Sequence, residues 1–345
     1  MTPRAKLQDV ALAAGVAVST VSGILNSRSD SWASAETKER VFEAARKLGY
    51  TPNRLARSLR LQHNNLALLV VPDLLNPFFA GLAREVTQAM KARGYEVTLE
   101  ETEFKPEREA RILNEIASRH VDGLIGVFAR PASHVEMLKR VSASFPVVVF
   151  GSPLAHTLVD TLESDHRASL GEAIAHLREL GHRSVGFVDP LLGFDDPLAR
   201  VHFFRDFAEH SGMLTNKNWM IRCTSDLSHI RTTVSDWAAH CRPVERPTAL
   251  FCMNDLTAIA TIRGLKDAGL SVPGDISVIG FDNIALGAFL ESPLTTIAQP
   301  LETMGQMATD ILVNRISRQR VGPATHLTMP TRLIIRASTG RAATS

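Results

Sequence analysis

The sequence contains little cysteine and no long hydrophobic run. Its 345 residues include three cysteines, Cys223, Cys241 and Cys252, an odd number without C-x-x-C spacing. A chain of this length can bury a core without disulfide bonds, so scattered cysteines indicate a reducing compartment. No apolar run approaches the length that would span a membrane. These absences predict a cytoplasmic protein that is not inserted in a membrane.

The motifs of common enzyme and cofactor sites are also absent. The chain has no G-x-G-x-x-G, no P-loop, no G-x-S-x-G and no H-E-x-x-H, and its twelve histidines form no ligand cluster by spacing. We therefore expect no catalytic residue, no cofactor and no metal site. A Rossmann-type oxidoreductase, which would need the dinucleotide motif, is disfavoured for the same reason.

Charge is divided unevenly along the chain. The net charge is only +2, but the first 65 residues hold ten Lys and Arg against five Asp and Glu, which gives them +5 and leaves −3 for the rest. A basic head on a slightly acidic body is typical of a polyanion-binding module. Arg4, Lys6 and the run that follows look superficially like a signal peptide, but Asp9 and the weakly hydrophobic alanines argue against one. An exported sugar receptor without a DNA function is therefore disfavoured.

The stretch LQDVALAAGVAVSTVSGILN, residues 7–26, has the spacing of two short helices joined by a tight turn. Gly15 can adopt the left-handed backbone that such a turn needs, while Val21 and Ile24 face back into the pair. The free face of the second helix carries hydroxyl side chains that can reach phosphates or base edges, those of Ser19, Thr20 and Ser22. The pattern favours a helix-turn-helix, with an ordinary pair of antiparallel helices as the alternative.

A third helix and a basic segment follow. Ser34 is a plausible N-cap for a helix from Ala35 to about Leu48, and Gly49 ends it. The next basic run, RLARSLRL at residues 54–61, is too short to hold a helix alone in water. It is therefore either a flexible linker or a helix that a nucleic-acid groove and a partner chain must order.

From Leu66 onward, short apolar runs alternate with amphipathic helical stretches. This pattern predicts a parallel, doubly wound α/β body, and its length favours two lobes with a cleft between the carboxyl ends of their strands. The predicted strands are Leu66–Val71, Glu96–Leu99, Gly123–Phe128, Val147–Phe150, Ser184–Val188, Thr248–Cys252 and Ile276–Gly280. The predicted helices are Phe78–Arg93, Glu107–Arg119, His166–Leu180, Leu198–His210 and Leu256–Ala268.

Polar residues follow several of these strands at positions where an α/β cleft holds ligands. Such a residue serves equally well as a helix N-cap, so spacing alone leaves both roles open. The residues concerned are Asp73, Asn254, Asp255, Asp282 and Asn283.

The chain resembles the lactose-repressor/galactose-repressor (LacI/GalR) family of bacterial transcription regulators along nearly its whole length. The resemblance rests on residues 7–26, on SAETKERVFEAARKLGYTPNRLARSLR, and on VVPDLLNPFF, RHVDGLIGVF, LRELGHRSVGF, PTALFCMNDLTAIA, VPGDISVIGFDNIAL and SPLTTIAQP. It implies a helix-turn-helix head, a hinge helix, and a two-lobed body of the periplasmic sugar-binding-protein type that binds a small effector and dimerises. No leucine heptad follows Arg336, so a dimer is expected rather than a tetramer.

The resemblance also implies domain boundaries. We predict the head at residues 1–52, the hinge helix and linker at 53–65, and the body at 66–345. One lobe is expected to comprise residues 66–157 with 295–325, and the other residues 158–290 with 326–340.

Residues that contact DNA are implied by the family pattern. In the recognition helix and just after it, these are Val18, Ser19, Thr20, Ser22 and Asn26. In the hinge they are Asn53, Arg54, Ala56 and Leu59, with Leu59 as the apolar wedge in the minor groove. The pattern departs at position 23, where many members have Arg: Gly23 cannot bind guanine with two hydrogen bonds.

The effector site is implied by five residues of the body: Phe78, Phe79, Arg200, Asn254 and Asp282. Two aromatic rings and polar groups in a cleft suit a sugar, a sugar acid or a nucleoside-like molecule. Phe203 stands where the family often has Gly, which would reshape the pocket. Taken together, the sequence predicts a DNA-binding transcriptional regulator, a repressor of a palindromic operator whose affinity a small effector controls.

Overall fold

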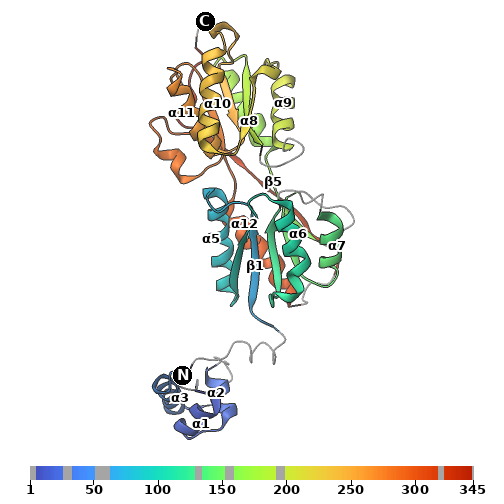
Figure 1. The fold of residues 1–345 in the computed structure, drawn as a ribbon, viewed down its shortest axis with the longest axis vertical. Helices are drawn as coiled ribbons and strands as arrows, with labels where there is room; N and C mark the ends of the chain where they lie inside the picture. Colours follow the sequence, from blue (N-terminus) through green and yellow to red (C-terminus); the bar gives the residue numbers. More distant parts are fainter. Residues whose placement is uncertain are drawn as a thin grey trace. The chain divides into compact units, whose positions relative to one another are not determined.

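The computed structural model describes residues 5–25, 33–50, 63–128, 134–151, 159–191, 199–317 and 322–343. The chain divides into two compact units, Met1–Asn64 and Asn65–Ser345, which we call the head and the body (Figure 1). The basic segment 54–61 lies outside the described residues.

The head is a small helical unit built on a helix-turn-helix. Its helices are α1 (Leu7–Ala14), α2 (Val18–Leu25) and α3 (Ala35–Lys47). Gly15 ends α1 with a φ of 64°, and α1 and α2 meet at 104°. That angle is typical of the helix-turn-helix motif, so the turn predicted at Gly15 is confirmed. Side chains from all three helices form one apolar core: Val10, Ala11, Ala14, Val21, Ile24, Val41, Ala44 and Ala45.

Side-chain caps fix where these helices begin. The Asp9 carboxylate accepts a hydrogen bond from the Lys6 N–H at 2.7 Å at the start of α1. The Ser34 hydroxyl accepts one from the Thr37 N–H at 3.2 Å, which confirms Ser34 as the N-cap of α3. Among the described residues no single helix is long and apolar enough to cross a membrane, and α1 and α2 satisfy such a test only when joined across their bend.

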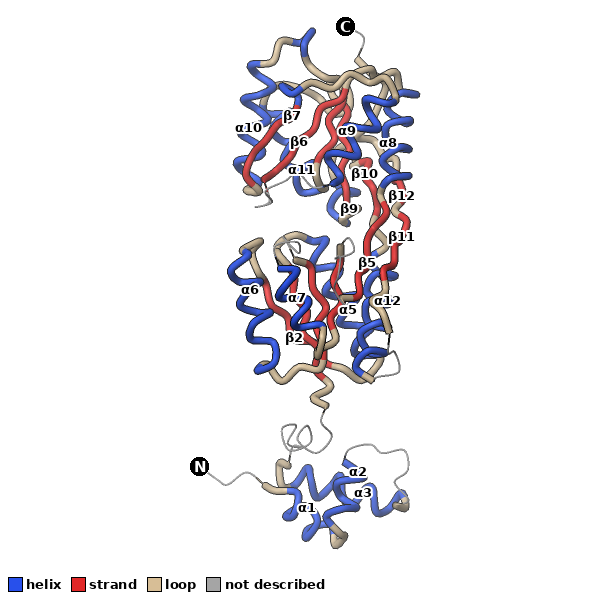
Figure 2. The backbone as a smooth tube through the Cα atoms, turned by 90° about the vertical axis from the view of Figure 1, so that its right-hand side faces the viewer, coloured by secondary structure: helices blue, strands red, loops and turns tan. Residues whose placement is uncertain are grey.

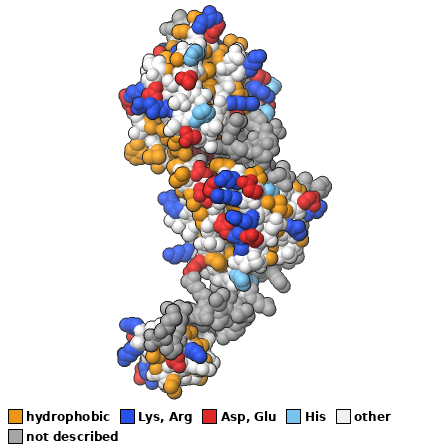
Figure 3. All heavy atoms as spheres, viewed as in Figure 1, with side chains coloured by type: hydrophobic (Ala, Val, Ile, Leu, Met, Phe, Trp, Pro, Cys, Tyr) orange, Lys and Arg blue, Asp and Glu red, His pale blue; other side chains and the backbone are white. Residues whose placement is uncertain are grey.

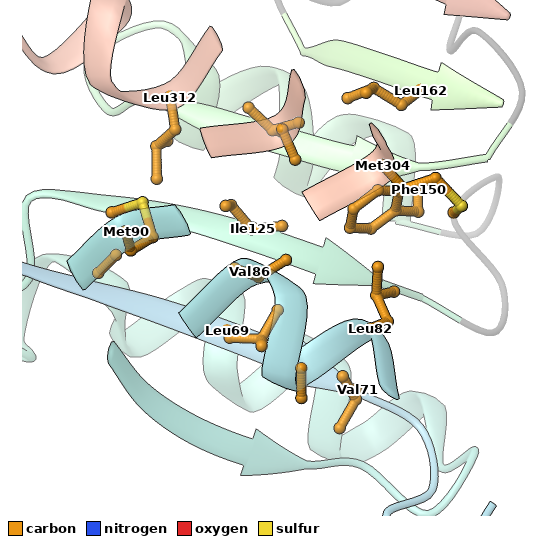
Figure 4. Packing of buried hydrophobic residues seen from close by; sticks show 14 of the residues in the cluster. Leu69, Val71, Leu82, Val86, Met90, Ile125, Phe150, Leu162, Met304 and Leu312 are labelled. Carbon is orange, nitrogen blue, oxygen red and sulfur yellow. The ribbon is translucent and has the colours of Figure 1, made fainter. Parts of the chain in front are cut away.

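The first lobe of the body is a parallel sheet covered by helices on both faces. Its described strands run in the order β11-β5-β4-β3-β1-β2. Helices α5 (Pro77–Ala92) and α12 (Leu301–Ile316) cover one face, and α6 (Pro106–Glu115) and α7 (Val135–Ser142) cover the other. Figure 4 shows the core under α5 and α12, where Leu82, Val86 and Leu312 pack on Leu69 and Ile125 of the sheet. The strands are β1 (Leu66–Val71), β2 (Glu96–Glu101), β3 (Gly123–Val127), β4 (Val147–Phe150), β5 (Asp160–Asp165) and β11 (His326–Pro330).

The second lobe repeats this architecture. Its described strands run in the order β12-β10-β9-β8-β6-β7, all parallel except β12, which is antiparallel to β10. Helices α8 (Arg167–Glu179) and α9 (Ala199–His210) cover one face, and α10 (Leu227–His240) and α11 (Asp255–Asp267) cover the other. The strands are β6 (Val185–Leu191), β7 (Met220–Thr224), β8 (Ala249–Cys252), β9 (Ser277–Asp282), β10 (Thr295–Ala298) and β12 (Arg332–Ile334).

The chain passes between the lobes at places that differ from the predicted lobe boundaries. Strands β5 and β11 both belong to the first sheet, and β10 belongs to the second. The crossings therefore follow Asp165, Ala298 and Pro330 rather than residues 157, 290 and 325 (Figure 2). The sequence pattern missed β5 and β11 because DTLESD and HLTMP are not continuous apolar runs.

Candidate functional site

One face of α2 lies away from the apolar core of the head. Val21 and Ile24 are buried in the head core, whereas Ser19 is exposed and Val18 is 41% exposed. Thr20 and Ser22 are half-buried beside them. Because the core uses the opposite face of α2, the predicted contact residues at its N-terminal end are accessible to a nucleic-acid groove.

Gly23 lies on α2 without a steric reason for being glycine. A Cβ built at this position meets no atom within 4 Å, and the residue is not among those with a positive φ. A longer side chain therefore fits here, so its absence removes a potential base contact without adding a packing contact.

Five predicted DNA contacts cannot be placed. Asn26, Asn53, Arg54, Ala56 and Leu59 lie outside the residues that the structure describes.

The second lobe gathers polar side chains around the aromatic ring of Phe281. The Arg200 guanidinium lies 3.4 Å from the centroid of that ring, and its Nη1 donates to the Met253 carbonyl oxygen at 2.6 Å. Its Nε is buried and has no hydrogen-bond partner among the described residues. Asp282, which directly follows Phe281 in the chain, accepts a hydrogen bond at 2.7 Å from Gln299 Nε2. The structure thus brings Arg200 and Asp282, two of the predicted effector-site residues, into one polar cluster.

Burial shifts the ionisation of this cluster. Burial lowers the pKa of Arg200 to about 10, although the carboxylates of Asp282 and Asp255 oppose the change. Burial raises the pKa of Asp282 to about 6, against the effect of Arg200. Near neutral pH the cluster therefore presents a guanidinium together with a buried carboxylate that is largely ionised.

Asp255 is a structural clamp. Its fully buried carboxylate accepts a hydrogen bond from the Ile284 N–H at 2.8 Å and one from the Thr296 hydroxyl at 2.6 Å. Burial and the nearby charge of Asp282 raise the pKa of Asp255 to about 7. With both of its oxygens engaged, Asp255 holds the segment after β9 in place and offers little to a ligand.

The other polar residues with open roles all accept hydrogen bonds, which are local for Asn254 and Asp73 and long-range for Asn283. Asn254 caps α11, because its Oδ1 accepts from both the N–H and the hydroxyl of Thr257, at 2.9 and 2.8 Å. Asp73 accepts from the Leu75 N–H at 2.8 Å, and Asn283 accepts from Arg336 at 2.7 Å. The N-cap reading is thus observed for Asn254, and its amide nitrogen remains available at the start of α11.

His166 belongs to the same cluster, and the sequence pattern did not identify it as a site residue. Its ring lies 5.6 Å from that of Phe203 and 6.0 Å from that of Phe281. Its Nδ1 donates to the Ser164 carbonyl oxygen at 3.0 Å, so Nε2 is the unprotonated nitrogen of the neutral ring. That Nε2 is buried with no partner among the described residues, and burial lowers the pKa of His166. In the sequence, His166 directly follows β5, a strand that the pattern of apolar residues did not reveal, so its position gave no usable signal for a site.

The predicted aromatic residues lie on the first lobe. The rings of Phe78 and Phe79 are 5.2 Å apart in an edge-to-face arrangement, and Phe104 lies 6.2 Å from Phe79. Phe78 is buried in the first-lobe core, where it packs together with Ile284 of the second lobe, and Phe79 is half-buried. No ring contact or hydrogen bond among the described residues joins Phe79 to Arg200. The aromatic pair of the first lobe and the polar cluster of the second are therefore connected only through the apolar core that contains Phe78 and Ile284.

The architecture defines a class of protein: a small helix-turn-helix unit followed by a two-lobed α/β body with a polar cluster at the carboxyl end of a strand. Family comparison gives the particular family. The model described as "Bacterial regulatory proteins, lacI family" matches residues 6–53, and that described as "Periplasmic binding protein-like domain" matches residues 174–339.

Individual relatives agree with these matches. The chain is 31% identical over 316 residues to the HTH-type transcriptional repressor PurR of Aliivibrio salmonicida, covering 90% of this chain and 92% of the relative. It is 29% identical to the HTH-type transcriptional regulator DegA of Bacillus subtilis, covering 96% and 97%. The chain belongs to the lacI family of bacterial regulatory proteins.

Solved structures share the fold. A complex of the transcriptional regulator CelR with cellobiose has a TM-score of 0.69 at 27% identity, covering 97% of this chain and 100% of the other. The lac repressor dimer bound to operator and the anti-inducer ONPF has a TM-score of 0.79 at 22% identity, covering 98% and 100%. A lacI-family regulator from Lactobacillus casei with bound glucose has a TM-score of 0.68 at 28% identity, covering 79% and 99%.

These findings confirm the family resemblance and the fold class. The chain is a DNA-binding transcriptional regulator. Its relatives are regulators and not enzymes, which removes the oxidoreductase alternative.

Proposed function

We propose that this chain represses transcription as a homodimer on a palindromic operator, and that a small sugar-like effector bound between the lobes of the body controls its affinity for DNA. The observation that carries the proposal is the exposed N-terminal end of α2 on a basic head, in a chain of the lacI family. A cytoplasmic location remains part of the proposal.

Base reading is assigned to Val18 and Ser19, and phosphate or base contacts to Thr20 and Ser22. Hydroxyl groups at a helix N-terminus add to the backbone N–H groups there, which favour a phosphate. Asn26 and the hinge residues Asn53, Arg54, Ala56 and Leu59 complete the predicted DNA contacts. Because eight hinge residues cannot hold a helix alone, their folding is expected only with DNA and a second hinge.

The proposed homodimer would place two heads on one DNA duplex. A two-fold pair of heads reads a palindrome with half-sites about one helical turn apart. The body offers an exposed apolar pair for the contact: on the short helix η5 (Ala285–Phe289), Phe289 is 85% exposed and Leu286 is 56% exposed. Figure 3 shows hydrophobic side chains gathered on the surface of the second lobe. Exposed apolar patches of this kind mark protein interfaces.

The effector site is assigned to Arg200, Asn254 and Asp282 of the second lobe with Phe78 and Phe79 of the first. A carboxylate, a guanidinium and an amide can hold ring hydroxyls, and half-buried Phe79 can cover an apolar sugar face. Similar body structures hold cellobiose and glucose, which supports a carbohydrate-like ligand. The Gln299 side chain connects this site to two of the three lobe crossings, because Gln299 directly follows Ala298, donates to Asp282 and accepts from Ser164, each at 2.7 Å. A ligand that repositions Asp282 therefore acts on the segments that set the lobe arrangement.

The operator is tested by selecting bound duplexes from a random pool with the purified full-length chain. The proposal expects a palindrome with a flexible central step, and affinity that falls steeply with salt. Absence of any enriched sequence would contradict it.

The effector is tested by measuring operator affinity and thermal unfolding with a panel of sugars, sugar acids and nucleosides. A compound that changes both operator affinity and thermal unfolding should bind the Asp282→Asn variant at least about tenfold more weakly than the unchanged chain. The reason is that a hydrogen bond to a charged group contributes about 1.5 to 3 kcal/mol. The matched control is Asp206→Asn, an exposed carboxylate on α9 of the same lobe. Equal losses in both variants would move the site elsewhere.

A further inference from the structure

A cavity lies outside the cluster around Phe281, between helix α9 and strands β6 and β7. Its volume is about 550 Å³, within the range of small-molecule sites. The cavity opens to the surface, because Arg205, Glu209, Lys217 and Arg222 on its border are exposed.

The accessible apolar lining of the cavity comes from Trp219 and Met220, which are both half-buried. Val185, Phe187, Val201 and Phe204 also border the cavity but are only 2% to 4% exposed, because they belong to the second-lobe core. The ring of Phe204 is stacked on that of Phe251, with the ring centroids 4.3 Å apart. A flat apolar ligand can therefore pack against the indole of Trp219, as aromatic rings do with one another.

The rim of the cavity is basic. It carries Arg205, Lys217 and Arg222 against one carboxylate, Glu209. Glu209 Oε1 accepts a hydrogen bond from the Thr215 hydroxyl at 3.0 Å, but the Arg205 Nε is 3.9 Å from it, beyond hydrogen-bond distance.

The other two cations of the rim, Lys217 and Arg222, make fewer contacts than Arg205. In the part of the chain that the structure describes, neither Lys217 nor Arg222 has a hydrogen bond or an ion pair within 4 Å. The Arg222 charge lowers the pKa of Asp189, but the burial of that carboxyl raises it by more. Within the described ranges, the rim therefore holds cationic donors that make no hydrogen bond to another side chain or to the backbone.

We propose that this cavity binds a small organic anion with a flat apolar body, such as an aromatic carboxylate or sulfonate. The apolar body packs on Trp219 and Met220, and the anionic group accepts charge-assisted hydrogen bonds from Arg205 and Arg222. The site is separate from the proposed effector cleft, yet both use α9: Arg200 lies in its first turn and contacts Phe281, whereas Val201 and Arg205 line the cavity. A ligand here thus touches the helix that holds the Arg200 guanidinium.

Anilinonaphthalenesulfonate is a suitable probe, because its fluorescence rises in an apolar site and it carries one anionic group. Titration of the folded full-length chain should give saturable binding of one probe per chain. The neutral analogue N-phenylnaphthylamine, which lacks the sulfonate, should bind at least about tenfold more weakly, because a charge-assisted hydrogen bond contributes about 1.5 to 3 kcal/mol.

Three variants locate the binding. The double variant Arg205→Gln with Arg222→Gln removes two exposed rim charges. It should bind the probe at least about tenfold more weakly, and its circular dichroism spectrum should be unchanged. Arg178→Gln removes an exposed charge from the last turn of α8, outside the cavity, and should change nothing. Asp282→Asn should leave the probe unaffected, whereas a probe bound beside Arg200 would bind this variant more tightly.

The proposal is overturned by any of four results. These are no saturable binding, equal binding of the neutral analogue, the same loss in Arg178→Gln as in the double variant, or a change of affinity in Asp282→Asn. None of these results bears on operator binding, so this test is independent of the proposed function.

Discussion

Replacing Gly23 by Ala should stabilise the head. The position lies inside α2, and a Cβ there meets no atom within 4 Å, so the added methyl group costs nothing in packing. Ala is favoured over Gly in a helix interior by about 0.5 to 1 kcal/mol, chiefly because Gly loses more backbone entropy on folding. A gain of 1 kcal/mol corresponds to about a fivefold smaller population of the opened head.

Hydrogen exchange of the full-length chain, followed by mass spectrometry on peptides from residues 7–25, measures that population. Exchange that requires head opening should slow by about twofold to fivefold in Gly23→Ala. The matched control is Gly15→Ala: Gly15 has a φ of 64°, a conformation that costs other residues about 1 kcal/mol or more. Exchange should therefore accelerate in this variant. If both variants shift exchange in the same direction, the assignment of Gly15 to the turn and Gly23 to the helix is refuted.

Other predictions concern the body. A thiol reagent should modify only Cys241 in the native chain, because burial raises the pKa of the other two cysteines to about 11 and 12; fast labelling of more than one thiol would contradict this. The folded-state pKa values of Asp282 and Asp255, about 6 and about 7, lie above the ordinary aspartate value of 3.8, so the folded body holds protons that the unfolded chain releases. This pair therefore lowers the free energy of unfolding as pH rises from about 4 to 7, and Asp282→Asn should flatten that fall by about 2 to 3 kcal/mol in urea titrations at several pH values. An unchanged pH dependence would show that the carboxyl is not desolvated. Phe289→Asp should halve the mass measured by sedimentation if η5 makes the dimer contact, whereas an unchanged mass would place that contact elsewhere.

Local signals in the sequence were sufficient for the head. The helical period, the N-cap at Ser34 and the glycine at position 15 all act within a few residues, and each was found where it was predicted. The buried parallel strands were predictable for a similar reason, since a strand covered on both faces is a continuous apolar run. Strands such as β5 and β11 carry polar side chains and depend on pairing partners far away in the chain, so their own residues gave no signal.

The sequence predicted which types of residue form the candidate site, but not which of them bind a ligand and which stabilise the fold. Asn254 and Asp255 are neighbours in the sequence, yet one caps α11 and the other clamps the segment after β9 through Ile284. The difference depends on backbone direction and on contacts some thirty residues away, which spacing does not contain. His166 was missed for the same reason, because its partners Phe203 and Phe281 come from two other elements.

The most direct test of sequence reading by α2 is to compare affinities for the selected operator and for a scrambled duplex. The full-length chain and a Val18→Ala, Ser19→Ala double variant are measured at the same salt concentration. The double variant should lose about 1 to 3 kcal/mol of binding free energy on the operator and almost nothing on the scrambled duplex, because base contacts specify the sequence and phosphate contacts do not. An equal loss on both duplexes, or no loss on either, would contradict the assignment of α2 as the helix that reads DNA.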